Sequence, residues 1–194
     1  MKLRFRRPLA LLLTIVMVLG LLPTAALAAD GETKLTEVKL TDAAGQEIAN
    51  LLDSDATPSL DGYTAYTLRI SVSLDTTTST DTKTLTVQLP YGMKFVGLDA
   101  ENLVKSNTAI DSAQWTKGES IYNGAYKPDN GTLAIKFSSG ASAATVSLSV
   151  QPDMAFFPIE KAEEGYSISD AIKVTLLEGD TEKGNAGCDT ATVT

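Results

Sequence analysis

The feature that most constrains this chain is a strict alternation of apolar and polar residues, which recurs in short runs. The longest run, residues 66–74, places five apolar side chains on one face and Thr, Arg and Ser on the other. A period of two turns one face of a strand to a core and the other to water, and it is typical of antiparallel sheets. The same pattern predicts strands at residues 36–40, 84–89, 133–137, 146–150 and 172–176, with a last short strand at 190–194.

Turn-forming dipeptides separate these runs, at Asp61-Gly62, Asn123-Gly124, Asn130-Gly131 and Ser139-Gly140. Roughly seven to nine short strands with frequent turns predict an all-β, two-sheet antiparallel sandwich. A closed barrel is the alternative, but its regular up-and-down spacing is missing. The polar segment 75–83 is interpreted as a hairpin loop, and residues 161–165 as one helical turn. Without an internal repeat or linker, residues 29–194 are predicted to form a single β-sandwich domain.

The segment LPYGMKFVG, residues 89–97, interrupts the alternation with a Pro-Tyr-Gly sequence. Pro90 cannot donate to a strand ladder, which suits a strand end. Gly92 supplies the backbone freedom that a tight corner needs. The segment therefore predicts a corner between two strands, with Tyr91 left at the rim.

The first 28 residues have the three parts of a secretory signal peptide: a basic start, a nearly all-apolar run of 14 residues from Leu9 to Leu22, and a small-residue site ending at Ala28. A membrane anchor is the alternative, but a spanning helix needs about 18 apolar residues. Cleavage removes four basic residues and no acidic ones, so the formal charge goes from −8 to −12. Such a charge disfavours nucleic acid and anionic lipid as partners, and no membrane insertion is expected after cleavage.

The chain contains no histidine and one cysteine, Cys188. A Ser-His-Asp triad, histidine-based metal sites and a Cys-His hydrolase are therefore excluded. A carboxylate pair for glycoside hydrolysis keeps a hydrolase fragment open as a third function, but we expect no enzyme. Export without a disulfide framework suggests a bacterial secreted protein.

Acidic side chains make calcium the metal ion to consider. Asp53, Asp55 and Asp61 fall close together in a region rich in turn residues. Calcium prefers hard oxygen ligands, so these three are its candidate ligands. The EF-hand spacing fails at Thr57 and Pro58, and an exposed acidic loop is the alternative interpretation.

Residues 115–126, WTKGESIYNGAY, place three aromatic side chains among Gly and Asn. Flat rings with a polar tip stack on sugars and peptides, which makes Trp115, Tyr122 and Tyr126 candidate ligand-binding residues. The alternative places Trp115 in the sandwich core and the two tyrosines over its rim. A coplanar exposed strip of the three rings would favour sugar binding.

The strand segments resemble immunoglobulin-like domains of Gram-positive surface adhesins and the conserved-repeat domains of bacterial envelope proteins. The resemblance covers most of residues 33–150, and the segments that carry it are Val38–Ile48, Tyr66–Leu74, Thr84–Val96, Gly131–Phe137 and Thr145–Val150. It implies an immunoglobulin-like sandwich outside the cell, used for adhesion or as a spacer.

The resemblance also implies a host or matrix protein, or a glycan, as the partner. A carbohydrate-binding module, assisted by calcium, is the alternative function. Related adhesins bind peptides between two sandwiches, whereas one is predicted here, so no groove residue carries over. The chain is either a piece of a longer surface protein or a secreted protein that stands alone, and its oligomeric state is open.

Overall fold

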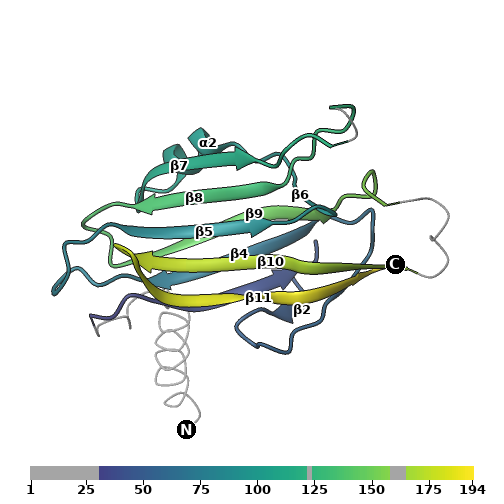
Figure 1. Cartoon of the computed structure of the whole chain (residues 1–194). Helices are drawn as coiled ribbons and strands as arrows, with labels where there is room; N and C mark the ends of the chain where they lie inside the picture. Colours follow the sequence, from purple (N-terminus) through teal and green to yellow (C-terminus); the bar gives the residue numbers. More distant parts are fainter. Residues whose placement is uncertain (1–30, 122–123, 158–164) are drawn as a thin grey trace, which may run out of the picture.

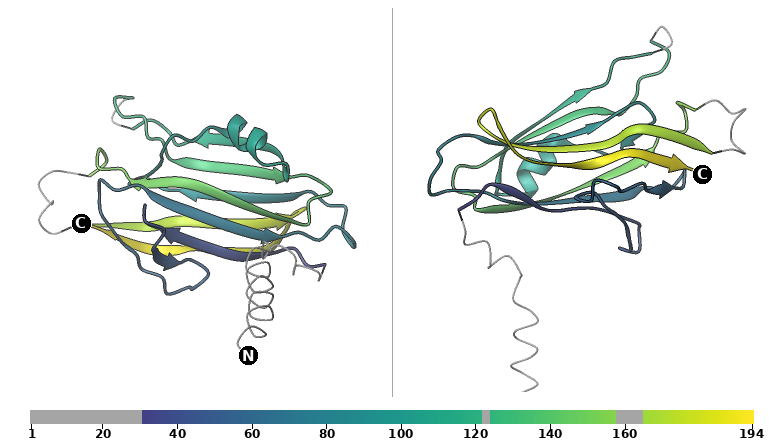
Figure 2. Two further views of the ribbon diagram at one scale, coloured as in Figure 1. Left: turned by 180° about the vertical axis from the view of Figure 1, so that it is seen from behind. Right: turned by 60° about the horizontal axis from the view of Figure 1, so that its bottom comes forward.

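The computed structural model describes residues 31–121, 124–157 and 165–194, which fold as two β-sheets packed face to face (Figures 1 and 2). The five-stranded sheet has the order β2-β1-β4-β9-β6. Its strands are β1 (Lys34–Thr41), β2 (Glu47–Asn50), β4 (Tyr66–Ser73), β6 (Met93–Phe95) and β9 (Ala143–Pro152).

The six-stranded sheet has the order β3-β11-β10-β5-β8-β7. Its strands are β3 (Ser59–Leu60), β5 (Lys83–Leu89), β7 (Ile110–Lys117), β8 (Gly131–Phe137), β10 (Tyr166–Glu178) and β11 (Thr181–Val193). The two-residue strand β3 runs parallel to the end of β11. The other strand pairs are antiparallel.

The predicted all-β, immunoglobulin-like two-sheet sandwich is confirmed, and every alternating run forms a strand. The described residues hold eleven strands, five and six per sheet, rather than seven to nine. The additional strands are β2, β3, β6 and β7, which are short or lie at a sheet edge. β2, β3 and β6 have four residues or fewer, too few to show an alternation, and the edge strand β7 buries only Ile110 fully. The predicted signal peptide and most of the predicted turn at 161–165 lie outside the described residues.

The core lies between the two sheets and follows the alternation residue by residue. In β4, Leu68 and Ile70 are fully buried while Thr67 and Arg69 are exposed. Each buried Leu, Ile or Val contributes about 1.5–3 kcal/mol of hydrophobic free energy. The opposing sheet supplies further fully buried side chains, among them Leu85, Val87, Leu133, Ile135, Val174 and Leu176.

The polar segment 75–83 is not the hairpin loop that the sequence predicted. It leaves β4 of the five-stranded sheet and enters β5 of the six-stranded sheet, so it crosses between the layers. Asp75 organises its start, because its carboxylate accepts hydrogen bonds from the main-chain amides of Thr77 and Thr78. The composition of the segment predicts a polar loop, but it does not predict which sheet the next strand joins, because that depends on long-range strand pairing.

The corner at residues 89–97 is confirmed and also carries the chain from one layer to the other. β5 ends at Leu89 in the six-stranded sheet, and β6 begins at Met93 in the five-stranded one. Gly92 has a φ of 94°, which suits glycine alone, and a Cβ there would lie 3.0 Å from the ring of Phe157. Tyr91 is half-buried at the rim.

A short helix, α2 (Ala100–Ser106), lies beside β7 along one edge of the sandwich (Figure 1). The Asp99 side chain caps it by accepting a hydrogen bond from the amide of Asn102 (3.0 Å). Leu103 and Val104 are partly buried and pack against the core. No described helix has the length and apolar character needed to cross a membrane.

The longest structural unit is the β10–β11 hairpin, whose strands have 13 residues each. Its turn lies at the end of the sandwich where β1 begins, and Thr194 lies at the opposite end (Figure 1). β11 and β10 are the second and third strands of the six-stranded sheet, between β3 and β5.

Candidate functional site

The three predicted calcium ligands lie on either side of β3, and the carboxylates of Asp53 and Asp61 hold local turns. Asp53 accepts a hydrogen bond from the amide of Asp55 (3.2 Å). Asp61 accepts from the amide of Tyr63 (2.8 Å) and the hydroxyl of Thr64 (3.1 Å). Within the described residues, no three or more Asp, Glu or Cys side chains gather as a metal site would require. Calcium binding stays a prediction.

Trp115 lies on the edge strand β7 and is half-buried, neither enclosed between the sheets nor freely exposed. Its indole N–H donates to the main-chain oxygen of Asn130 (3.0 Å), and the ring meets Phe95 edge-on at 5.8 Å. The ammonium of Lys117 lies 4.4 Å from the ring centroid, a cation–π contact. Since Lys117 covers one ring face, stacking a sugar on that face would require the lysine to move.

The other two predicted ligand residues do not extend Trp115 into a visible strip. Tyr122 lies outside the described residues. Tyr126 is half-buried, and its hydroxyl hydrogen-bonds the carboxylate of Asp153. Asp153 is itself buried and faces the ammonium of Lys94 at 3.6 Å. The structure therefore gives Tyr126 a role in anchoring the chain after β9, and ligand binding by these residues stays a prediction.

Four rings that the sequence did not group form a row beside the corner at Gly92. Tyr91 stacks on Phe156 (5.8 Å between centroids), Phe156 meets Phe157 edge-on (5.5 Å), and Phe157 stacks on Tyr166 (4.4 Å). The hydroxyl of Tyr91 donates to the main-chain oxygen of Glu119 (3.1 Å). Aromatic pairs of this kind add about 0.5–1.5 kcal/mol beyond area burial, so the row stabilises this end of the sandwich.

The opposite end of the sandwich holds three charged side chains and one hydroxyl, which we call the ionic clamp: Lys83, Glu178, Lys183 and Thr33. The Glu178 carboxylate accepts from the Thr33 hydroxyl (3.0 Å) and lies 3.4 Å from the Lys83 ammonium and 2.9 Å from that of Lys183. Thr33, Lys83 and Glu178 are buried. A buried charge needs such partners, because burial alone would favour the neutral form.

The clamp shifts the pKa of two of its members, Glu178 and Lys183. The hydrogen bond from Lys183, followed by those from Thr33 and Lys83, lowers the pKa of Glu178 against an opposing desolvation effect. The same contact raises the pKa of Lys183. The pairing of β5 with β10 and the buried partners fix the Glu178 carboxylate in place. The clamp is therefore suited to connecting the two sheets rather than to acid–base chemistry.

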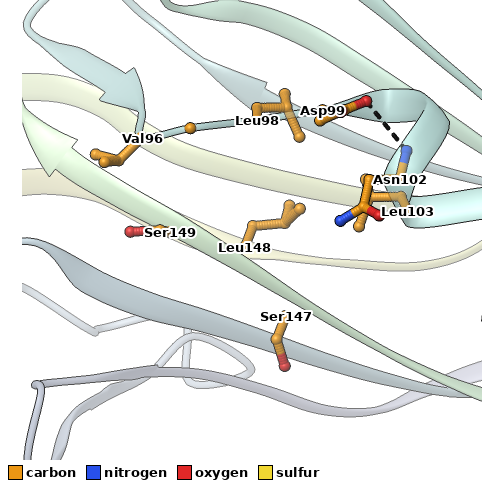
Figure 3. Close-up of a pocket in the computed structure, with 9 residues that line it drawn as sticks. Val96, Leu98, Asp99, Asn102, Leu103, Ser147, Leu148 and Ser149 are labelled. Carbon is orange, nitrogen blue, oxygen red and sulfur yellow. Dashed lines mark hydrogen bonds between the residues drawn. The ribbon is translucent and has the colours of Figure 1, made fainter. Parts of the chain in front are cut away.

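A small notch of about 250 Å³ opens in the outer edge of the five-stranded sheet, between β9, α2 and the loop that joins β6 to α2 (Figure 3). We call it the β9 notch. Its apolar walls are Val96, Leu98 and Leu103, and Asp99 and Asn102 lie at its rim. Its floor is β9 from Ser147 to Ser149.

The floor of the β9 notch carries unpaired main-chain groups. On this edge, the amide of Val96 donates to the oxygen of Ser149 (2.8 Å), and the Asn107 side chain donates to the oxygen of Thr145 (3.0 Å). Since successive residues of a strand point their main-chain groups to opposite sides, Ser147 faces this same edge. Among the described residues, β6 pairs only with residues 150–152, and no main-chain partner reaches Ser147.

Sequence reasoning missed the β9 notch because α2 and β6 are short and the notch depends on where β6 stops. One signal was available. Asp99 precedes a segment with Glu101 and Lys105 four residues apart, which is typical of a capped helix start. That signal predicts the helix, but it does not predict which strand edge the helix leaves open.

The fold and the sequence define the class of protein as a two-sheet β-sandwich without histidine. The family model described as “Putative adhesive domain (group 6)” matches residues 45–192. The chain therefore belongs to this adhesive-domain family, and the predicted resemblance to surface adhesins is confirmed.

A solved pilin structure also resembles this chain. The 35 kDa C-terminal fragment of the major pilin GBS80 of Streptococcus agalactiae aligns with a TM-score of 0.37 and 8% sequence identity. The alignment covers 84% of this chain and 56% of the pilin chain, so this protein spans little more than half of that fragment. No curated protein matches the sequence.

Proposed function

We propose that this chain is a non-enzymatic adhesive module displayed on, or secreted from, a bacterial cell. The observation that carries the proposal is the family match, which extends from the turn before β2 to the end of β11 and so includes nearly the whole sandwich. The absence of histidine in the sequence supports a binding role over catalysis. The predicted signal peptide supports a location outside the cytoplasm.

Binding to immobilised partners tests the proposal. Beads coated with residues 29–194 are expected to show saturable binding to at least one member of a panel of matrix proteins, and uncoated beads none. Heat-unfolded protein on matched beads is the control, because adhesion by a folded module requires the sandwich. A panel without any saturable binding would contradict adhesion.

A spacer role is a second candidate, favoured by the positions of the chain ends. The first described residues and Thr194 lie at opposite ends of the sandwich, so a chain that continued on both sides would cross its full length (Figure 1). Small-angle scattering from two tandem copies would then show about twice the maximum dimension of one copy. Copies folded back on each other would give a much smaller increase and contradict the spacer role.

Glycan binding with calcium stays the alternative prediction for the loops around Trp115 and Asp53. A glycan array probed with and without calcium tests it. We expect any glycan bound through Trp115 to lose affinity in Trp115→Ala and to gain it in Lys117→Ala, because the lysine covers a ring face. Equal binding by both variants would place the glycan elsewhere.

A further inference from the structure

We propose that the β9 notch binds an extended peptide segment of a partner protein, which pairs its main chain with Ser147 and inserts an apolar side chain between Val96, Leu98 and Leu103. This inference rests on the proposed adhesive function and names the partner chemistry for it. The probe experiments below do not depend on which partner the module adheres to, so the two proposals fail separately.

The first argument is hydrogen-bond complementarity. Ser147 turns one donor and one acceptor to the same edge, between the paired oxygens of Thr145 and Ser149. A residue in a peptide strand offers the matching acceptor and donor at the same spacing, which is how strands add to a sheet edge. A metal ion would bind only the oxygen of this pair.

The second argument is size. From Thr145 to Ser149 the strand rises by about 13 Å, at roughly 3.3 Å per residue. Val96 and Asn107 already hold the two ends of this stretch, so an added strand has room for about three residues. The notch has a volume of about 250 Å³. This volume is too small for several large side chains of a partner and suits one apolar side chain with its flanking main chain.

The third argument is the character of the walls and rim. Val96 is 38% exposed, unusual for a large apolar residue in this chain, and it lies opposite Leu103 across the notch. Burying such surface on an apolar side chain supplies the driving force that main-chain pairing alone lacks. Asp99 is exposed at the rim of the notch. The chain without residues 1–28 has a formal charge of −12, so the peptide is expected to be neutral or basic.

A second copy of the chain is a less suitable occupant. A long open edge such as β7, at the border of the six-stranded sheet, has eight residues, and a strand of that length would collide with Val96 and Asn107 at the ends of the notch. A flexible peptide can enter, pair over a short stretch and leave.

The experiment uses ¹⁵N-labelled residues 29–194 and the capped tripeptide Ac-Gly-Leu-Gly-NHMe as probe. Titration is expected to shift the amides of Val96, Leu98 and Ser147 saturably, in the millimolar range expected of so small a ligand. Two matched peptides separate the contributions: Ac-Gly-(N-methyl-Leu)-Gly-NHMe lacks the central donor, and Ac-Gly-Gly-Gly-NHMe lacks the apolar side chain. Each is expected to bind at least tenfold more weakly.

Substitutions in the protein test the same site independently of changes in the peptide. Val96→Lys places a charge on the wall without touching the core, and at least a fivefold loss of affinity is expected. Leu52→Lys is the matched control, because Leu52 is an apolar residue of similar exposure (42%) outside the notch, and its affinity should stay within twofold. Unchanged melting temperatures for both variants show that the fold is intact.

Three results would overturn the proposal. Equal binding of the N-methyl peptide would show that no main-chain pair forms with Ser147. Shifts confined to another surface, such as β7 or the aromatic row, would place the peptide elsewhere. Slow hydrogen exchange at the Ser147 amide in the free protein, or shifts of the notch residues on raising the protein concentration alone, would show that another part of the chain or a second copy already occupies the edge.

Discussion

The hydroxyl of Thr33 donates to the carboxylate of Glu178 across 3.0 Å, although 145 residues separate the two in the sequence. Thr33 precedes the first strand of the five-stranded sheet, and Glu178 ends β10 of the six-stranded sheet. The ionic clamp therefore joins the two layers at the end where the described chain begins, while the aromatic row stabilises the other end.

Removing the centre of the clamp should destabilise the protein strongly. Glu178→Ala leaves the buried ammonium of Lys83 without its carboxylate, so we expect the free energy of unfolding to fall by about 3 kcal/mol. Lys183→Ala should cost less, because Lys183 is the more exposed partner. Urea unfolding measures both. Glu101→Ala, which removes an exposed pair with Lys105, is the control and should change little; a comparable loss there would contradict the special role of the clamp.

The clamp should also make the free energy of unfolding depend on pH in two ranges, one acidic and one basic. The pKa of Glu178 is lowered from 4.5, so its contribution is present above that value and is lost as the pH falls through its folded-state pKa. The pKa of Lys183 is raised from 10.5, so its contribution is present below that value and is lost as the pH rises through its own folded-state pKa. We expect the stability difference between the wild type and Glu178→Gln to be constant from about pH 6 to 9 and to shrink below about pH 4. Urea unfolding across this range checks it, and an undiminished difference at pH 3 would contradict the assignment.

Gly131 should be irreplaceable at the start of β8. Its φ is 102°, and a Cβ there would lie 2.3 Å from the main-chain oxygen of Thr116 on β7. Gly131→Ala must therefore push β7 away, and we expect a loss of about 3 kcal/mol by urea unfolding. Gly140→Ala is the matched control, since its Cβ would meet nothing within 4 Å, and it should stay within about 0.5 kcal/mol. Equal effects would show that the strand spacing adjusts freely.

Cys188 should be unreactive in the folded protein. Its side chain is 2% exposed, and desolvation raises its pKa to about 11, so little thiolate forms at neutral pH. We expect no reaction with Ellman's reagent at pH 8 over an hour and one thiol per chain after addition of urea. Rapid labelling of the native protein would contradict the burial of β11 at this position.

The sequence predicted the parts of the fold that depend on local pattern. Alternation identified β4, β5 and β8 because each has one face in the core, and Gly92 identified the corner because few other residues adopt its φ. Segment 75–83 was misassigned because a polar loop has the same composition whether it returns to its own sheet or crosses to the other.

The candidate sites depended more on long-range placement and were predicted less well. For Trp115 the sequence left a core position and a ligand-binding position open, because its partners Phe95 and Asn130 come from distant parts of the chain. The β9 notch exists because β6 ends before it can pair with Ser147, and no local pattern encodes that ending. Likewise, Lys83 and Glu178 are ordinary charged residues in sequence, and only the strand order buries them together.

The position of the β10–β11 hairpin between β3 and β5 has a consequence for the order of folding. The hairpin is formed by residues 166–193, so β5 and β3 have no partner on that side until these residues are available. Pairings between such distant segments form slowly because loop closure must precede them. A chain threaded through a membrane channel from its N-terminus would therefore remain open during passage and close its sheet only after the hairpin had emerged.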